Sequence, residues 1–181
     1  MKKEENVLEL FFNEPTKHWH FEEILKEAKI SRPQASLWLN KMRQEGIVQR
    51  IKKRAKMPYY ISYFNNPPYK SRKRVYAIEQ LWKSGFLSHV LSLKNTKIVT
   101  IFGSFVTSDW YSQSDIDLFI YGDASAFDQS YYRKKLHRQI QLFVCKTQED
   151  IKKIPKPLLL NMMKGYTIKG TGTEIKEVLN G

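Results

Sequence analysis

The stretch KIVTIFGSFVTSDWYSQSDIDLFIYG, residues 97–122, decides the fold of the second half of this chain. Its first six residues are rich in β-branched side chains and are bounded by charge and glycine, which predicts a buried strand over 97–102. Gly103 and Ser104 follow that strand directly, and ten residues separate Ser104 from the sequence Asp115-Ile116-Asp117. LFIYG then continues as a second strand, so a turn and an acidic pair lie between two strands.

The acidic pair has a definite geometry on a strand. Alternate side chains point to the same side, so Asp115 and Asp117 are expected to share one side while Ile116 and Leu118 point into the core. Two carboxylates this close repel each other unless a divalent cation lies between them, and Mg²⁺ (or Mn²⁺) prefers such oxygen ligands together with phosphate oxygens. A Gly-Ser turn at the end of a strand can offer backbone N–H groups and a hydroxyl to phosphate.

This combination resembles the nucleotidyltransferase superfamily that includes DNA polymerase beta, and within it the minimal nucleotidyltransferase domains. The resemblance covers about residues 85–170, where PLLLNMMKGYTIKG (157–170) is similar to the C-terminal tail of these domains. It implies that Gly103 and Ser104 bind the phosphates of a nucleoside triphosphate and that Asp115 and Asp117 are catalytic and coordinate Mg²⁺. A nucleoside monophosphate would pass to an acceptor, and pyrophosphate would leave.

Two departures from the family pattern bear on catalysis. Family members usually carry Ala-Arg-Gly soon after Gly-Ser, whereas this chain has Val106-Thr107-Ser108. Active members also carry a third carboxylate on a later strand, and the matching strand, QIQLFV (139–144), has Gln141 in that place. An amide cannot act as a carboxylate base at neutral pH, so transfer activity is left open. The acids nearest in sequence that could replace it are Asp109, Asp123 and Glu149.

The charge of the chain is unevenly distributed. Of 181 residues, 31 are Lys or Arg and 18 are Asp or Glu, which gives a formal net charge of +13. Residues 1–74 hold 17 of the bases and 8 of the acids, so this segment alone carries +9. Such an excess favours a polyanionic partner, although a solvated basic face is the alternative.

Nothing in the composition suggests secretion or a membrane. There is one cysteine, Cys145, the chain begins with acids where a signal peptide needs an apolar run, and no apolar stretch approaches about 18 residues. We therefore expect a cytoplasmic protein without a membrane partner.

The first 66 residues contain three helical patterns followed by two short strands. The third helix, over 32–45, has a capping signal in Ser31 and Gln34 and a stop at Gly46. Strands are expected within 47–53 and 59–64, around a basic tip. This order resembles the winged helix-turn-helix family, which implies that helix 32–45 enters a DNA major groove and that the 53–57 wing contacts the backbone or minor groove. The residues expected to contact DNA are Arg32, Gln34, Asn40, Lys41, Arg43 and Gln44 on the helix and Lys53, Arg54 and Lys56 on the wing.

The sequence thus predicts an α+β protein with three parts. A winged helix-turn-helix DNA-binding domain occupies 1–66, a linker helix region 67–84, and a polymerase-beta-like nucleotidyltransferase α/β domain with a mixed sheet 85–181. The first functional hypothesis is a Mg²⁺-dependent nucleotidyltransferase that also binds DNA. The alternative is a DNA-binding transcriptional regulator whose second domain is catalytically impaired and serves as a sensor, a dimerisation module or an antitoxin-like module. A homodimer and a small partner protein both remain open, and the first domain could also mediate protein contacts instead of binding DNA.

Overall fold

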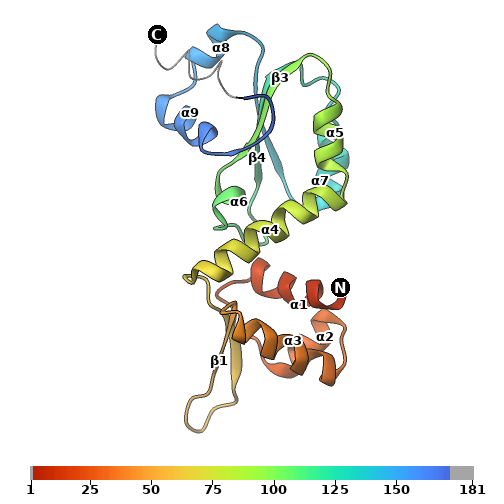
Figure 1. Ribbon diagram of the computed structural model, residues 1–181, viewed down its shortest axis with the longest axis vertical. Coiled ribbons are helices and arrows are strands. Elements are labelled where there is room, and N and C mark those ends of the chain that lie inside the picture. The colour runs from red at the N-terminus through yellow and green to blue at the C-terminus, as the bar shows by residue number, and fades with distance from the viewer. Residues whose placement is uncertain (1, 172–181) are drawn as a thin grey trace. The chain divides into compact units, whose positions relative to one another are not determined.

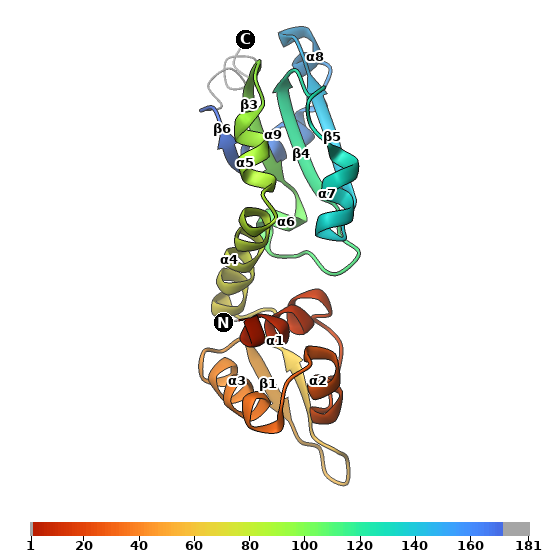
Figure 2. The same cartoon turned by 90° about the vertical axis from the view of Figure 1, so that its right-hand side faces the viewer.

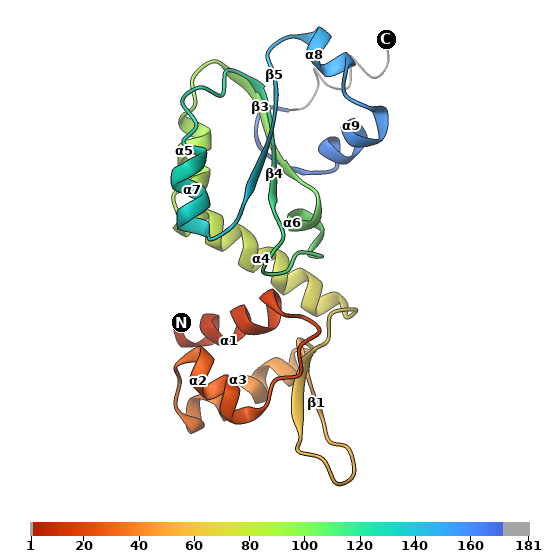
Figure 3. The same cartoon turned by 180° about the vertical axis from the view of Figure 1, so that it is seen from behind.

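The computed structural model describes residues 2–171, which fall into two compact units (Figures 1 to 3). The first unit extends to Lys73 and also contains Trp110–Ser112, and the second holds the other residues from Arg74 onward. The sequence predicted a linker helix region over 67–84; one continuous helix, α4 (Pro67–Lys83), occupies these residues, and the division between the two units falls within it. The periodicity of 75–82 predicted that helix, but helical spacing cannot tell which core each of its turns packs into.

Within the described residues, the first unit contains three helices, a two-stranded antiparallel sheet and the start of α4. Its other elements are α1 (Lys2–Asn13), α2 (Phe21–Ala28), α3 (Arg32–Gln44), β1 (Val48–Ile51) and β2 (Tyr59–Ser62). Helix α3 begins with the predicted capping box, in which the Gln34 side chain accepts from the backbone N–H of Ser31 at 3.2 Å. Gly46 lies just beyond its end at φ +70°, as predicted for a helix stop.

Apolar stripes from all three helices form the core of this unit. Its fully buried side chains include Val7, Phe11, Ile24, Leu39 and Met42. The carbonyl oxygen of Phe11 accepts two buried hydrogen bonds, from the Ser62 hydroxyl at 2.7 Å and the Tyr69 hydroxyl at 3.0 Å. These bonds tie α1 to β2 and to the first turn of α4. They also satisfy a buried carbonyl oxygen, which would cost free energy if it were left without a partner.

The described part of the second unit is a four-stranded mixed sheet with helices on both faces (Figures 1 and 3). Its strands are β3 (Thr96–Phe102), β4 (Ile116–Gly122), β5 (Ile140–Cys145) and β6 (Tyr166–Lys169). Its helices, besides the end of α4, are α5 (Phe86–Ser92), α6 (Ser104–Thr107), α7 (Gln129–Leu136), α8 (Gln148–Lys152) and α9 (Lys156–Met163). The strand order is β5-β4-β3-β6; β3 is antiparallel to both its neighbours, and β4 is parallel to β5. The predicted mixed sheet is confirmed.

Helices α5 and α7 cover one face of this sheet and α9 covers the other (Figure 1). As expected, Ile116 and Leu118 are buried in the core. Phe119 and Tyr121, on the side of Asp117, are buried as well. They pack with residues of α8 and α9, including Ile151, Leu159 and Met162. The helices after β5 supply this second core layer, and a single strand cannot reveal them.

Candidate nucleotide-binding site

Strand pairing brings the separate motifs of the sequence together at one end of the sheet. Phe102, the last residue of β3, is the register partner of Asp117 on β4, and Gly103 follows it immediately. On the other side of β4, Asp117 is the register partner of Gln141 on β5. Paired residues of neighbouring strands project to the same face, so Asp117 and Gln141 share a face of the sheet. The structure therefore brings Gly103, which follows β3, together with Asp117 on β4 and Gln141 on β5.

Gly103 occupies a position that only glycine tolerates. Its backbone has φ +74° and ψ −153°, a region that residues with a side chain rarely adopt. A Cβ atom built on it would lie 2.2 Å from Oδ2 of Asp117, far inside van der Waals contact. The absence of a side chain at Gly103 thus lets the Asp117 carboxylate lie directly against the turn that leads into Ser104.

The two carboxylates differ in their surroundings. Asp115 is exposed, whereas Asp117 is half-buried as the second residue of β4. Burial, and then the negative charge of Asp115, raise the pKa of the Asp117 carboxyl above its ordinary value. A divalent cation would relieve both effects, because it replaces lost hydration and neutralises the repulsion. The donor set, two carboxylates with an amide oxygen on the next strand, therefore suits Mg²⁺ or Mn²⁺.

A third carboxylate is not supplied from elsewhere in the described chain. Asp123 follows the opposite end of β4, six residues from Asp117, which corresponds to about 20 Å along a strand. Glu149 lies on α8, beyond the same end of β5. Asp109 is closer, since its backbone N–H donates to the carbonyl of Ser104 at 3.2 Å. Yet no group of three or more acidic, His or Cys side chains arranged to hold a metal ion occurs within residues 2–171.

Arg138, which the sequence indicates only as part of a basic stretch with Arg133, Lys134 and Lys135, lies beside Ser114 and the acidic pair. It stands in the turn between α7 and β5, and its Nη1 donates to the carbonyl oxygen of Ser114, the residue before Asp115, at 3.0 Å. Its guanidinium carbon is 5.7 Å from the ring centroid of Phe105, the residue after Ser104. The available signal was topological: β4 and β5 are parallel, so residues just before β5 lie beside the residues just before β4.

In the first unit, several residues expected to contact DNA already have partners, and Nη1 of Arg43 donates to Oδ1 of Asn40 at 3.4 Å. Gln34 accepts from Ser31 in the capping box and from Nζ of Lys3 at 3.2 Å. Arg32 forms an ion pair with Glu22 at 2.7 Å on the surface. Nζ of Lys41 lies 2.9 Å from Oε1 of Glu4 on α1, and this hydrogen bond raises the pKa of Lys41. Such exposed pairs contribute little to stability and can exchange for other partners.

Three of the helix residues expected to contact DNA line a polar groove between α3 and β1, of about 610 Å³, which we call the α3–β1 groove. Its polar lining includes Asn40, Arg43, Gln44, Gln49 and Arg50. Gln49 and Arg50 come from β1 and were not among the residues expected to contact DNA. The lining contains two arginines and no acid, so this groove is suited to an anionic ligand.

The expected wing residues lie on the loop between β1 and β2. Lys53, Arg54 and Lys56 are all exposed there, and Ala55 between them has a left-handed backbone with φ 58°. No acidic residue occurs between β1 and β2. With Lys52, which is also exposed, the loop therefore presents four cations to solvent.

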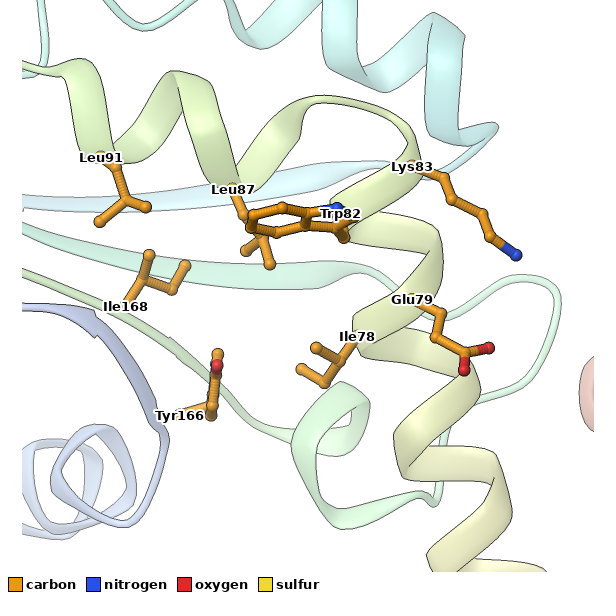
Figure 4. A pocket seen from close by; sticks show the side chains of 8 residues that line it. All are labelled: Ile78, Glu79, Trp82, Lys83, Leu87, Leu91, Tyr166 and Ile168. Atoms are coloured by element: carbon orange, nitrogen blue, oxygen red, sulfur yellow. The ribbon is translucent and has the colours of Figure 1, made fainter.

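A second depression in the second unit has a different character (Figure 4). It measures about 340 Å³ and lies among α4, α5 and β6. Its lining is mostly apolar, with Trp82, Leu91 and Tyr166 well exposed. In Figure 4 the charged ends of Glu79 and Lys83 point away from the apolar side chains. With no cation directed into it and none of the acidic pair in its lining, this depression does not suit a triphosphate.

Comparison with known proteins agrees with the geometry of the second unit. Residues 87–168 match the family model described as "Polymerase beta, Nucleotidyltransferase". This match supports the polymerase beta-like superfamily for that unit and a nucleotidyltransferase-like function. Searches of curated proteins and of solved structures found no match.

Among residues 2–171, none of the helices has both the length and the apolar character needed to cross a membrane.

Proposed function

We propose that the second unit binds a nucleoside triphosphate with Mg²⁺ (or Mn²⁺) and transfers its nucleoside monophosphate to an acceptor. The observation that carries this proposal is the contact of the Asp117 carboxylate with Gly103, which joins the acidic pair to the Gly-Ser turn. Phosphate oxygens bound at Gly103 and Ser104 would lie next to a cation held by Asp115 and Asp117. The family match over 87–168 supports the same assignment.

The residues would divide the work as follows. The bound cation would supply charge neutralisation of the triphosphate. Gly103 leaves room for the phosphates and for Asp117, and Ser104 offers a hydroxyl to a phosphate oxygen. The acceptor oxygen would bond to the α-phosphorus as the bond to pyrophosphate breaks, and the acceptor proton would pass to solvent. The Gln141 amide can hydrogen-bond the acceptor but cannot take this proton, so we expect slow transfer.

The test is transfer of label from each α-labelled nucleoside triphosphate, with Mg²⁺, to DNA, RNA and the protein itself. Pyrophosphate release provides a second readout that does not depend on the acceptor. The proposal predicts transfer by the wild type and none by Asp115→Asn. Asp109→Asn is the matched control, because it removes an exposed acid of the same connection without touching the pair. Equal activity in the wild type and in Asp115→Asn would contradict the proposal.

For the first unit we propose a winged helix-turn-helix that binds DNA. Helices α2 and α3 are separated by the three residues 29–31, and a β-hairpin with a basic loop follows. The lining of the α3–β1 groove and the exposed cations of the hairpin support contact with bases and phosphates. Fluorescence anisotropy with random and genomic duplexes tests this. Affinity should fall steeply with salt, and an Arg54→Ala/Lys56→Ala variant should bind with a smaller salt slope.

A second candidate function is a DNA-binding regulator whose second unit binds nucleotide without transferring it. It is favoured by one observation, the neutral Gln141 in register beside Asp117 on β5. Calorimetry separates the two candidates. Binding of Mg²⁺–nucleotide without transfer or pyrophosphate release, together with a DNA affinity that changes when the nucleotide is present, would support the regulator. A second protein that co-purifies, or a dimer, would indicate the antitoxin-like or dimerisation role instead.

A further inference from the structure

The proposed nucleotide site lacks a cation within its own motifs. Between Gly103 and Asp117 the chain contains three acids, Asp109, Asp115 and Asp117, and no Lys or Arg. A triphosphate with one divalent cation remains an anion, so its phosphates need a positive partner from another part of the fold. The structure places one basic residue, Arg138, against both Ser114 and Phe105 at this site.

Arg138 is held against the site rather than extended into solvent. Its side chain is half-buried and contacts the connection between β3 and β4 at two places, Ser114 and Phe105. One contact is a hydrogen bond to a backbone carbonyl, and the other places the guanidinium over an aromatic ring. Both fix the planar group in position, so little side-chain entropy would be lost when it binds an anion.

The chemistry of arginine suits this place. A guanidinium has five N–H donors in one plane and can hold a carbonyl oxygen and phosphate oxygens at the same time. Phe105 follows Ser104 directly, so a group over its ring lies next to the turn where phosphates are expected. Ser114 precedes Asp115, so the same group lies next to the first metal-binding carboxylate.

We propose that Arg138 binds the phosphates of the nucleotide at this site and supplies the positive charge that the stretch from Gly103 to Asp117 lacks. This inference rests on the proposed nucleotide binding. It adds a binding residue from the turn between α7 and β5, far along the chain from both motifs.

Calorimetry with Mg²⁺–NTP, with Mg²⁺–tripolyphosphate and with the free nucleoside tests the proposal. Arg138→Gln keeps an N–H donor for the Ser114 carbonyl but removes the charge. It should weaken binding of the NTP and of tripolyphosphate by about 10- to 100-fold, because a hydrogen bond to a charged group contributes that much. Arg138→Lys retains the charge and should recover part of the loss. Arg133→Ala, which removes an exposed arginine of α7, is the matched control and should bind like the wild type.

The outcomes are distinct. A wild type that binds neither the NTP nor tripolyphosphate would overturn the proposed function along with this inference. A wild type that binds both, with unchanged affinity in Arg138→Gln, would overturn this inference alone. If Arg138 has only a structural role, Arg138→Gln and Arg138→Lys should both have a lower melting temperature, and Arg138→Lys should not recover tripolyphosphate binding. That result would also overturn this inference.

Discussion

Replacing Gly103 with alanine tests the geometry on which the proposed site depends. The backbone at φ +74° and ψ −153° costs a residue with a side chain about 1–3 kcal/mol. The new Cβ would lie 2.2 Å from Oδ2 of Asp117, whereas ordinary van der Waals contact begins near 3.4 Å, so the carboxylate must retreat by roughly 1.2 Å. Misplacing a reacting group by about 1 Å can lower a rate about 10²-fold. We therefore expect Gly103→Ala to lose at least about tenfold in Mg²⁺–NTP affinity and about 10²-fold in transfer.

Gly85→Ala is the control for substitution of a glycine with positive φ. Gly85 has φ +77° and ψ 3°, the left-handed region, and a Cβ built there would have no heavy atom within 4 Å. It should cost about 1–2 kcal/mol in stability, since the left-handed region disfavours alanine, and leave nucleotide binding unchanged. Calorimetric melting measures the stability change, with about 4–8 °C expected per kcal/mol in a unit of roughly 100 residues. Titration with Mg²⁺–NTP measures binding.

The reasoning would be refuted by a Gly103→Ala variant that binds Mg²⁺–NTP as tightly as the wild type does. It would also be refuted if Gly85→Ala lost as much Mg²⁺–NTP affinity as Gly103→Ala, because the contact between position 103 and Asp117 could then not be the cause of the loss. A wild type that binds no nucleotide would refute the proposed function instead.

Three further predictions concern single side chains. Because the pKa of Asp117 is raised, its protonated form stabilises the fold at low pH, and this contribution is lost as pH rises through the raised pKa. Without Mg²⁺, Asp117→Asn should therefore have a higher melting temperature than the wild type at neutral pH, and the two should melt alike at acid pH. The same variant should not bind Mg²⁺–NTP. Equal melting temperatures of Asp117→Asn and the wild type at neutral pH would contradict the conclusion that the fold buries the charge of Asp117. Gln141→Glu restores a carboxylate beside Asp117 and should raise the transfer rate by about 10²–10⁴-fold, which pyrophosphate release measures and an unchanged rate would refute. In DNA anisotropy, Arg43→Ala should weaken binding about tenfold or more, whereas Lys41→Ala should have a smaller effect because Lys41 is paired with Glu4; a larger loss for Lys41 would reverse this assignment.

Local signals in the sequence were sufficient for most elements. The capping box at Ser31, the stop at Gly46 and the strand 97–102 all depend on residues close together in the chain, and the structure confirms them. The mixed sheet followed from the resemblance carried by the Gly-Ser turn and the acidic pair. The division of α4 between two units did not follow, because it depends on which core each helical turn enters.

The candidate site was predicted in part for the same reason. Gly103, Ser104, Asp115 and Asp117 lie in motifs of fixed spacing, so the sequence could name them. The sequence placed Arg138 only in a basic stretch, because its position beside Ser114 and Phe105 results from the parallel pairing of β4 with β5. In the first unit, Gln49 and Arg50 line the α3–β1 groove because β1 packs beside α3, and this packing could not be predicted from neighbouring residues.

The sequence by itself therefore determined the chemistry available to this protein: a Gly-Ser turn, an acidic pair without its usual third acid, and a basic first unit. These are properties of residue type and short-range spacing, and they persist whichever way the chain packs. The tertiary structure alone decided which of these groups meet. Strand register set Asp117 between Gly103 and Gln141 and brought Arg138 to the edge of the pair. Register depends on long-range pairing and on burial of both faces of the sheet, and neither is visible from neighbouring residues alone.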